Sequence, residues 1–119
     1  MRFPLAGSWQ DTDSGDTFVE YLHEAGSFLQ RLQGLQFSKT IEPGYGLLLQ
    51  NCRSVHTMWL RFAIDVVFID NELTVLEIHR GVKPWRILIP KAKSVSHVIE
   101  MASGWEVQCK VGGRTEIVK

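Results

Sequence analysis

Apolar and polar residues alternate in short runs along most of the chain, and turn-forming residues separate these runs. Short β-prone runs bounded by Gly, Pro, Asn or Asp are typical of strands. We therefore predict strands at residues 16–24, 46–49, 64–69, 73–79, 85–89, 95–101 and 114–118. This pattern predicts a mainly β fold, a sandwich or partly open barrel of about six to eight short strands with two short helices.

The strand predicted at residues 64–69, IDVVFI, is the central one. Apolar residues stand on both of its alternating faces, which indicates that both faces are covered. Asp70 and Asn71 follow it and favour a turn, because both residues tolerate left-handed and side-chain-bonded conformations. Residues 73–79 are then the hairpin partner of this strand.

The two helices are predicted from capping-box spacings. Ser27 and Gln30 begin the first, which Gly34 ends, and Ser103 and Glu106 begin the second, which ends at residues 112–113. Residues 1–15 mix Gly, Ser, Asp and Pro with scattered apolar residues. We predict that they form an irregular lead-in to a single domain of residues 16–119.

The composition is that of a soluble globular protein of one domain. The chain has 119 residues, of which 45% are hydrophobic and 22% are charged. No apolar run approaches the roughly 20 residues that span a bilayer, and the first ten residues lack the apolar centre of a signal peptide. We therefore expect a cytoplasmic protein with no membrane contact.

Thirteen basic and thirteen acidic residues cancel, which argues against nucleic-acid binding. The charges are nevertheless uneven, because residues 80–93 hold five basic residues and no acidic one. Such a run is usually a solvated loop or strand edge, and it also offers a surface, Arg80–Lys93, to an acidic protein partner. Trp85 between Lys83 and Arg86 could stack on a nucleic-acid base, but the neutral total charge and the absence of an RNA-binding motif argue against this.

Asp65 is the most informative polar residue, because its neighbours are apolar and either face of the strand should bury it. A buried carboxylate must be paired or hydrogen-bonded, or its pKa rises. In one alternative Asp65 accepts backbone N–H groups or an arginine and fixes the register of the strand. In the other it lies at the floor of a pocket as a base or an anchor. The first is the more common arrangement.

Other reactive residue types do not form a convincing site. His56 follows Cys52 by four positions, which would suit a thiolate and its base only in a helix, and the segment looks extended. Cys52 and Cys109 are expected to be reduced thiols rather than a disulfide. No spacing of Cys, His and Asp predicts a metal site, and the sequence predicts no cofactor and no catalytic residue.

Several motifs together resemble the domain-of-unknown-function 192 family. They are Arg-x-x-Gly-Leu at residues 31–35, Gly-Leu-Leu-Leu at residues 46–49, Cys-x-x-Val-His-Thr at residues 52–57, Ile-Asp-Val-Val-Phe-Ile-Asp at residues 64–70, Lys-Pro-Trp-Arg at residues 83–86 and Glu-x-x-x-Gly at residues 100–104. The resemblance spans residues 28–118. It implies a mainly β fold and brings no established activity.

Three hypotheses for function follow. The first is a binding or accessory module with one polar pocket for a small polar or anionic ligand, which arginines would hold through paired N–H groups. The second is a hydrolase-like enzyme with Asp65 or His56 as general base, although the sequence leans against an enzyme. The third is a structural or protein-interaction domain without a ligand. The pocket of the first hypothesis is formed by His56, Thr57, Arg61, Asp65, Arg86 and Glu100.

Overall fold

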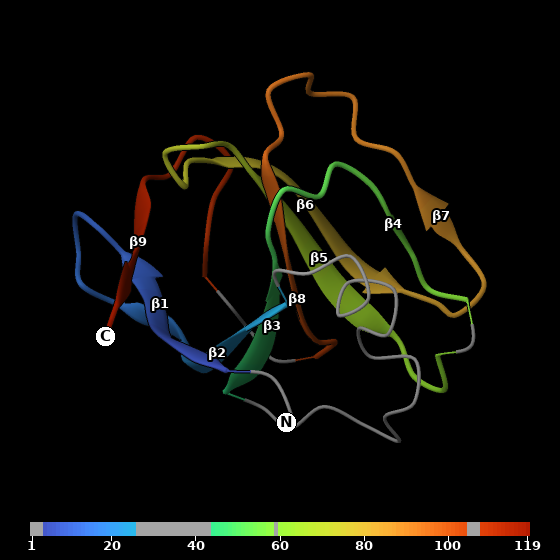
Figure 1. Cartoon of the computed structure of the whole chain (residues 1–119), viewed down its shortest axis with the longest axis horizontal. Helices are drawn as coiled ribbons and strands as arrows, with labels where there is room; N and C mark the ends of the chain where they lie inside the picture. Colours follow the sequence, from blue (N-terminus) through green and yellow to red (C-terminus); the bar gives the residue numbers. More distant parts are fainter. Residues whose placement is uncertain (1–3, 26–43, 59, 105–107) are drawn as a thin grey trace.

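The computed structural model describes residues 4–25, 44–58, 60–104 and 108–119, and this part of the chain is mainly β (Figure 1). It contains nine strands and no helix, and therefore no helix long and apolar enough to cross a membrane. The strands are β1 (Leu5–Asp11), β2 (Thr17–Ala25), β3 (Tyr45–Leu49), β4 (Val55–His56), β5 (Ile64–Ile69), β6 (Val75–Val82), β7 (Ile87–Leu88), β8 (His97–Ala102) and β9 (Thr115–Val118).

Seven strands form one curled sheet in the order β6-β5-β8-β3-β2-β1-β9. Only β2 and β3 pair in parallel, and the remaining neighbours in this sheet are antiparallel. The two edge strands meet at one end, where Thr74 bridges to Arg114 and the Val75 N–H donates to the Gly113 carbonyl at 3.0 Å. The sheet is therefore a partly open barrel, which is one of the two architectures that the sequence predicted. Strands β4 and β7 form a separate two-stranded sheet.

Two apolar clusters cover the two faces of this sheet. The first draws residues from all seven strands and fills the inside of the curl, with Trp9 and Ile99 among its fully buried members. The second lies on the opposite face, where Val66 and other sheet residues pack with Val55 and Leu88 of the small sheet. All six residues of β5 are buried between the two clusters, which confirms the predicted central strand.

The N-terminal segment differs from the prediction, because β1 lies within the stretch expected to be irregular. It pairs with both β2 and β9, and its Trp9 is fully buried. Gly7 has a φ of 143°, and a Cβ there would lie 2.4 Å from the Val118 carbonyl oxygen, so only glycine fits this close approach. The Gly and Ser residues that suggested a loop therefore serve a tight strand contact.

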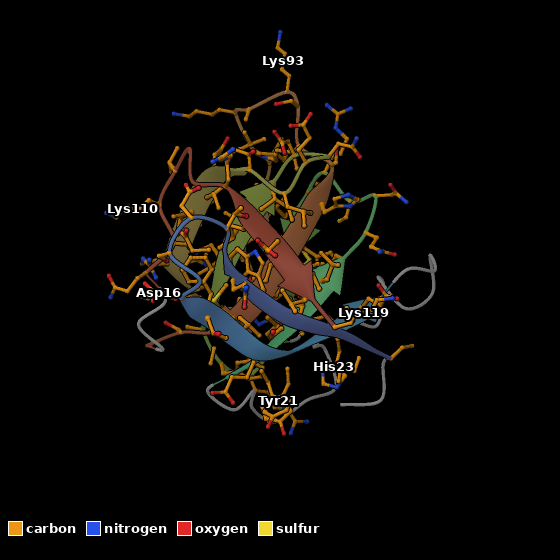
Figure 2. All side chains as sticks on the ribbon, turned by 90° about the vertical axis from the view of Figure 1, so that its left-hand side faces the viewer. Asp16, Tyr21, His23, Lys93, Lys110 and Lys119 are labelled. Atoms are coloured by element: carbon orange, nitrogen blue, oxygen red, sulfur yellow. The ribbon has the colours of Figure 1, made fainter. Side chains whose placement is uncertain are left out.

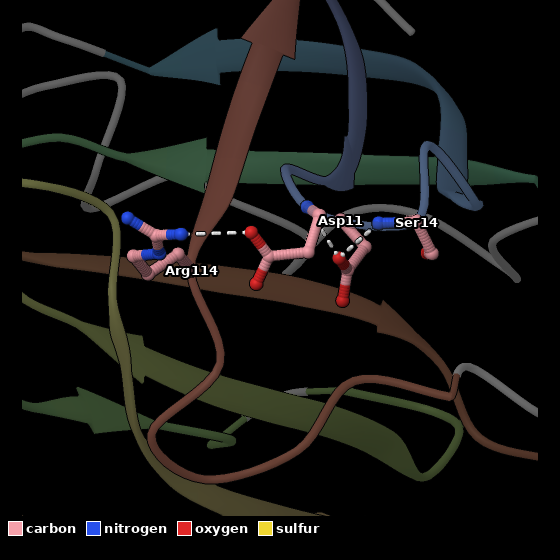
Figure 3. Close-up of polar contacts among 4 residues, drawn as sticks. Asp11, Ser14 and Arg114 are labelled. Carbon is pink, nitrogen blue, oxygen red and sulfur yellow. Dashed lines mark hydrogen bonds and ion pairs between the residues drawn. The ribbon is translucent and has the colours of Figure 1, made fainter.

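Side-chain contacts close the turn between β1 and β2 (Figure 3). The Asp11 carboxylate accepts the N–H groups of Asp13 and Ser14 at 2.8 and 2.9 Å. These bonds lower the pKa of Asp11, with the Ser14 N–H making the largest contribution. Asp13 pairs with Arg114 at 2.8 Å, which ties the turn to the segment before β9.

Most of the other predicted strands are present, with shifted ends. The predicted strand at residues 85–89 is reduced to the two residues of β7, and β4 was not predicted. The predicted helix at 103–112 is wrong in its described part, because residues 108–110 are irregular and residues 111–112 form a turn. Val111, which would share the inner face of such a helix, is exposed instead. The helix predicted at 27–34 lies outside the described residues.

Candidate functional site

Asp65 is buried, with 3% of its surface exposed, and it is bonded to the end of β6. One carboxylate oxygen accepts the Gly81 N–H at 2.8 Å, and the other lies 3.5 Å from the half-exposed guanidinium of Arg80. Gly81 has a φ of 63°, a left-handed conformation that glycine adopts without strain. Asp65 therefore fixes the end of β6, where the chain leaves the large sheet. This matches the first alternative from the sequence, in which Asp65 accepts a backbone N–H group or pairs with an arginine.

Thr57 is fully buried and holds the next part of that segment. Its hydroxyl donates to the Lys83 carbonyl at 2.7 Å and accepts the Arg86 N–H at 2.8 Å. Its backbone N–H donates to the Arg86 carbonyl, and its carbonyl accepts the Trp85 N–H at 3.0 Å. One residue thus fixes the chain from Lys83 to Arg86, including Trp85 at a left-handed φ of 66°.

Glu77 of β6 holds the far end of the same segment. Its carboxylate accepts the Ala92 N–H at 2.7 Å and lies 3.0 Å from the His79 ring nitrogen. The Ala92 N–H contributes most to lowering the pKa of Glu77. No periodicity singles out Glu77 in the sequence, because it stands on an amphipathic strand where an exposed acid is ordinary.

Residues 80–93, which these contacts hold, form a surface that we call the basic ridge. Trp85, Ile87 and Ile89 are 53%, 62% and 78% exposed on it. Between them Leu88 turns inward and packs with the apolar cluster beneath β4 and β7. Five cations accompany the exposed apolar residues, and the segment has no acid. The ridge lies at the side of the molecule where Figure 1 places β7.

Glu100 of β8 is buried in a different place. It stands opposite Leu47 of β3 and Val66 of β5, and both neighbours belong to the apolar cluster under the small sheet. Only 4% of Glu100 is exposed, and no hydrogen bond joins its carboxyl group to another residue that the structure describes. Loss of hydration raises the pKa of Glu100 to about 7.

The six predicted site residues do not meet in one pocket. Thr57 and Arg86 are joined by hydrogen bonds. Asp65 alternates with Val66 on β5 and therefore faces the inside of the curl, away from Glu100. His56 and Arg61 are exposed, and His56 contacts the ridge through the backbone pairing of β4 with β7, where it stands opposite Ile87. The side chains predicted to share one pocket therefore lie on two opposite faces of the sheet and on the surface of the molecule.

Two further predictions concern the thiols and metal ligands. Cys52 and Cys109 are not joined in a disulfide, as predicted, and burial raises the pKa of the Cys109 thiol. In the described part of the chain, no three His, Cys, Asp or Glu side chains are grouped so that they could hold a metal ion.

Sequence comparison identifies related proteins. The sequence model of DUF192, described as "Uncharacterized ACR", matches residues 10–117. A UPF0127 protein of Pyrococcus horikoshii is 35% identical over 92 residues, which are 72% of this chain and 76% of that protein. A UPF0127 protein of Pyrococcus furiosus is 32% identical over 100 residues, or 77% of this chain and 82% of that protein.

Two crystal structures share the fold. A Sinorhizobium meliloti protein, provisionally described as a transcription regulator, has a TM-score of 0.80 at 24% identity, and the match covers 98% of each chain. A Novosphingobium aromaticivorans protein of unknown function has a TM-score of 0.79 at 16% identity, with 92% of this chain and 83% of that one covered. At these identities the likeness shows the fold alone.

Proposed function

We propose that this chain, which belongs to the uncharacterised DUF192 family, is a docking module. It binds an acidic protein partner through the basic ridge. The observation that carries this proposal is the exposure of Trp85, Ile87 and Ile89 on one segment that the polar side chains of β5, β6 and the loop after β4 hold in place. Clustered large apolar side chains in water are typical of binding surfaces.

The hydrogen bonds that hold the ridge support its role as a binding surface rather than as a mobile, solvated loop. A loop that orders only on binding loses conformational entropy at that moment, whereas a loop already held in place does not. Asp65, Thr57 and Glu77 each accept at least one N–H of this segment, at Gly81, Arg86 and Ala92. The segment is therefore preorganised although its only regular structure is the two residues of β7.

The charges of the ridge favour an acidic partner. Arg80 pairs with Asp65, and the other four cations of the segment, Lys83, Arg86, Lys91 and Lys93, create a local positive field that the neutral total charge of the chain conceals. Tryptophan and arginine are also the residues most enriched at the centres of protein interfaces. An acidic partner with an apolar patch would satisfy both features.

The small-ligand and hydrolase hypotheses receive less support from the same contacts. Both oxygens of Asp65 face partners of its own chain, Gly81 and Arg80, and its strand neighbours are buried. A general base must reach a proton of the substrate within hydrogen-bond distance. The geometry therefore favours a scaffold role for Asp65.

A photo-crosslinking amino acid at position 87 tests the proposed function in the native host. We expect a discrete protein adduct, whose yield falls as KCl rises from about 50 to 300 mM because salt screens surface charges. Lys83→Glu combined with Arg86→Glu should abolish this adduct. A crosslinker at Val111, which is equally exposed away from the ridge, serves as the matched control. The same adducts at both positions, or none at position 87, would contradict the proposal.

A further inference from the structure

A cleft of about 400 Å³ opens beside the basic ridge, between the loop after β3 and the loop before β8. Its volume is in the range of sites that hold small molecules. No acidic residue is found among the described residues that line it. These lining residues are Asn51, Arg53, Lys93, Ser94, Val95 and Ser96.

Three hydrogen bonds join the loop after β3 to the loop before β8 and to the first residue of β8, and they give the cleft fixed walls. The Asn51 N–H donates to Nδ1 of His97 at 3.0 Å, and the Cys52 N–H donates to the Ser96 carbonyl at 3.0 Å. The Arg53 guanidinium donates to the Lys93 carbonyl at 2.6 Å. Asn51 has a left-handed φ of 53°, which turns the chain sharply at this wall.

The contact with Lys93 orients the Arg53 side chain and occupies only part of its donor capacity. A guanidinium carries several N–H groups in a fixed plane, so the groups not used by Lys93 remain for a ligand. Ser94 and Ser96 also line the cleft, and their hydroxyl groups are of a type that donates neutral hydrogen bonds. Lys93 extends from the rim into solvent in Figure 2.

His97 does not add charge to this site. Its Nδ1 accepts a hydrogen bond, and burial lowers the pKa of the imidazole, so the ring is neutral at neutral pH. The positive charge of the cleft therefore comes from Arg53, held in place, and from Lys93 at the rim.

We propose that this cleft binds a small phosphate-bearing molecule, with Arg53 as the main anchor. Planar guanidinium groups recognise phosphate oxygens through paired N–H groups, and the serine hydroxyls satisfy the remaining oxygens. The site lies outside the six residues from which the sequence predicted a pocket, and it does not depend on the docking role of the ridge.

The test is an NMR titration of the full chain with inorganic pyrophosphate. We expect saturable amide shifts concentrated at residues 51–53 and 93–97, and Arg53→Gln should weaken the affinity by at least about tenfold. Arg61→Gln is the matched control, because Arg61 is an exposed arginine that does not line the cleft. It should leave the affinity unchanged.

Two outcomes would overturn this proposal. The first is the absence of saturable shifts at residues 51–53 and 93–97 in the unmodified protein, a measurement that needs no variant and is insensitive to folding defects. The second is an affinity that depends on Arg61 and not on Arg53. Crosslinking at position 87 is scored separately, so failure of the cleft and failure of the ridge are distinguishable.

Discussion

Asp65 and Glu100 lie on neighbouring strands, one register position apart, and face opposite sides of the sheet. Asp65 stands opposite Met101, and Val66 stands opposite Glu100, so alternation sends the two carboxyl groups in opposite directions. Asp65 bonds to Gly81 and Arg80, whereas Glu100 stands among apolar side chains. The contacts of Asp65 thus stabilise the fold, whereas burial of the Glu100 carboxylate destabilises it when Glu100 is charged.

Removing the Asp65 carboxylate should lower stability. Asp65→Ala leaves the Gly81 N–H without its acceptor, and we expect a loss of about 2 kcal/mol in the free energy of unfolding. The pair with Arg80 adds little, because that side chain is 48% exposed. Urea denaturation measures the change. Asp65→Asn keeps an acceptor oxygen and should lose about half as much, while Asp16→Ala at an exposed position should stay within about 0.5 kcal/mol.

Thr57→Val should loosen the basic ridge without changing its surface. The variant keeps the shape of Thr57 but leaves the Lys83 carbonyl and the Arg86 N–H without the hydroxyl, which destabilises by about 2 kcal/mol. Crosslinking from position 87 should fall with it. Thr57→Ser loses a buried methyl group, about 1 kcal/mol, but keeps the hydroxyl and should keep the crosslink. Equal crosslinking in both variants would show that the hydroxyl does not organise the ridge.

Glu100 predicts an unusual pH dependence of stability. Its pKa is raised from 4.5 to about 7, so between these values the folded chain binds more protons than the unfolded chain. Stability should therefore fall as pH rises from 4.5 through 7 and level off above, by at most about 3 kcal/mol from this group. Glu100→Gln should remove this fall and stabilise the protein at pH 8.

The measurement is urea denaturation at a series of pH values. Glu20→Gln, at an exposed position, is the matched control and should leave the pH profile unchanged. A Glu100→Gln variant that is no more stable than the parent at pH 8 would mean that the carboxylate has a partner.

The exposed isoleucines of the ridge should matter for docking and not for folding. Ile87→Gln combined with Ile89→Gln changes side chains that are mostly in water, so the free energy of unfolding should change by less than about 0.5 kcal/mol. With the crosslinker placed at Trp85 instead, the partner adduct should be lost. A stable variant that retains the adduct would exclude these side chains from the interface.

Alternation within a strand predicted much of this structure. It predicted that β5 is buried on both faces and that Asp65 is buried. Alternation within one strand does not specify the register of that strand with its neighbour. For that reason the sequence predicts one pocket for Asp65 and Glu100, although they face opposite sides of the sheet. The partners of Asp65 also follow it by more than a dozen positions and depend on where β6 ends, which periodicity does not specify.

Two further features had no clear signal in the sequence. β1 was not predicted because Gly7 and Ser8 are typical of loops. Gly7 is required by a close backbone contact with Val118, which is distant in sequence and leaves no local pattern. The cleft beside Arg53 arises where two loops distant in sequence are joined by hydrogen bonds. The basic run itself was evident, but its exposed Trp85, Ile87 and Ile89 resembled an ordinary strand.

The most direct test of the central claim, that polar side chains of the neighbouring strands and loop hold the basic ridge in place before any partner binds, is amide hydrogen exchange in the free protein. The N–H groups of Gly81, Trp85, Arg86 and Ala92 donate to Asp65, Thr57 and Glu77. We predict that these four exchange at least about 100-fold more slowly than the same residues in an unstructured peptide. Exchange at the unstructured rate would contradict the account, because the ridge would then be a mobile loop.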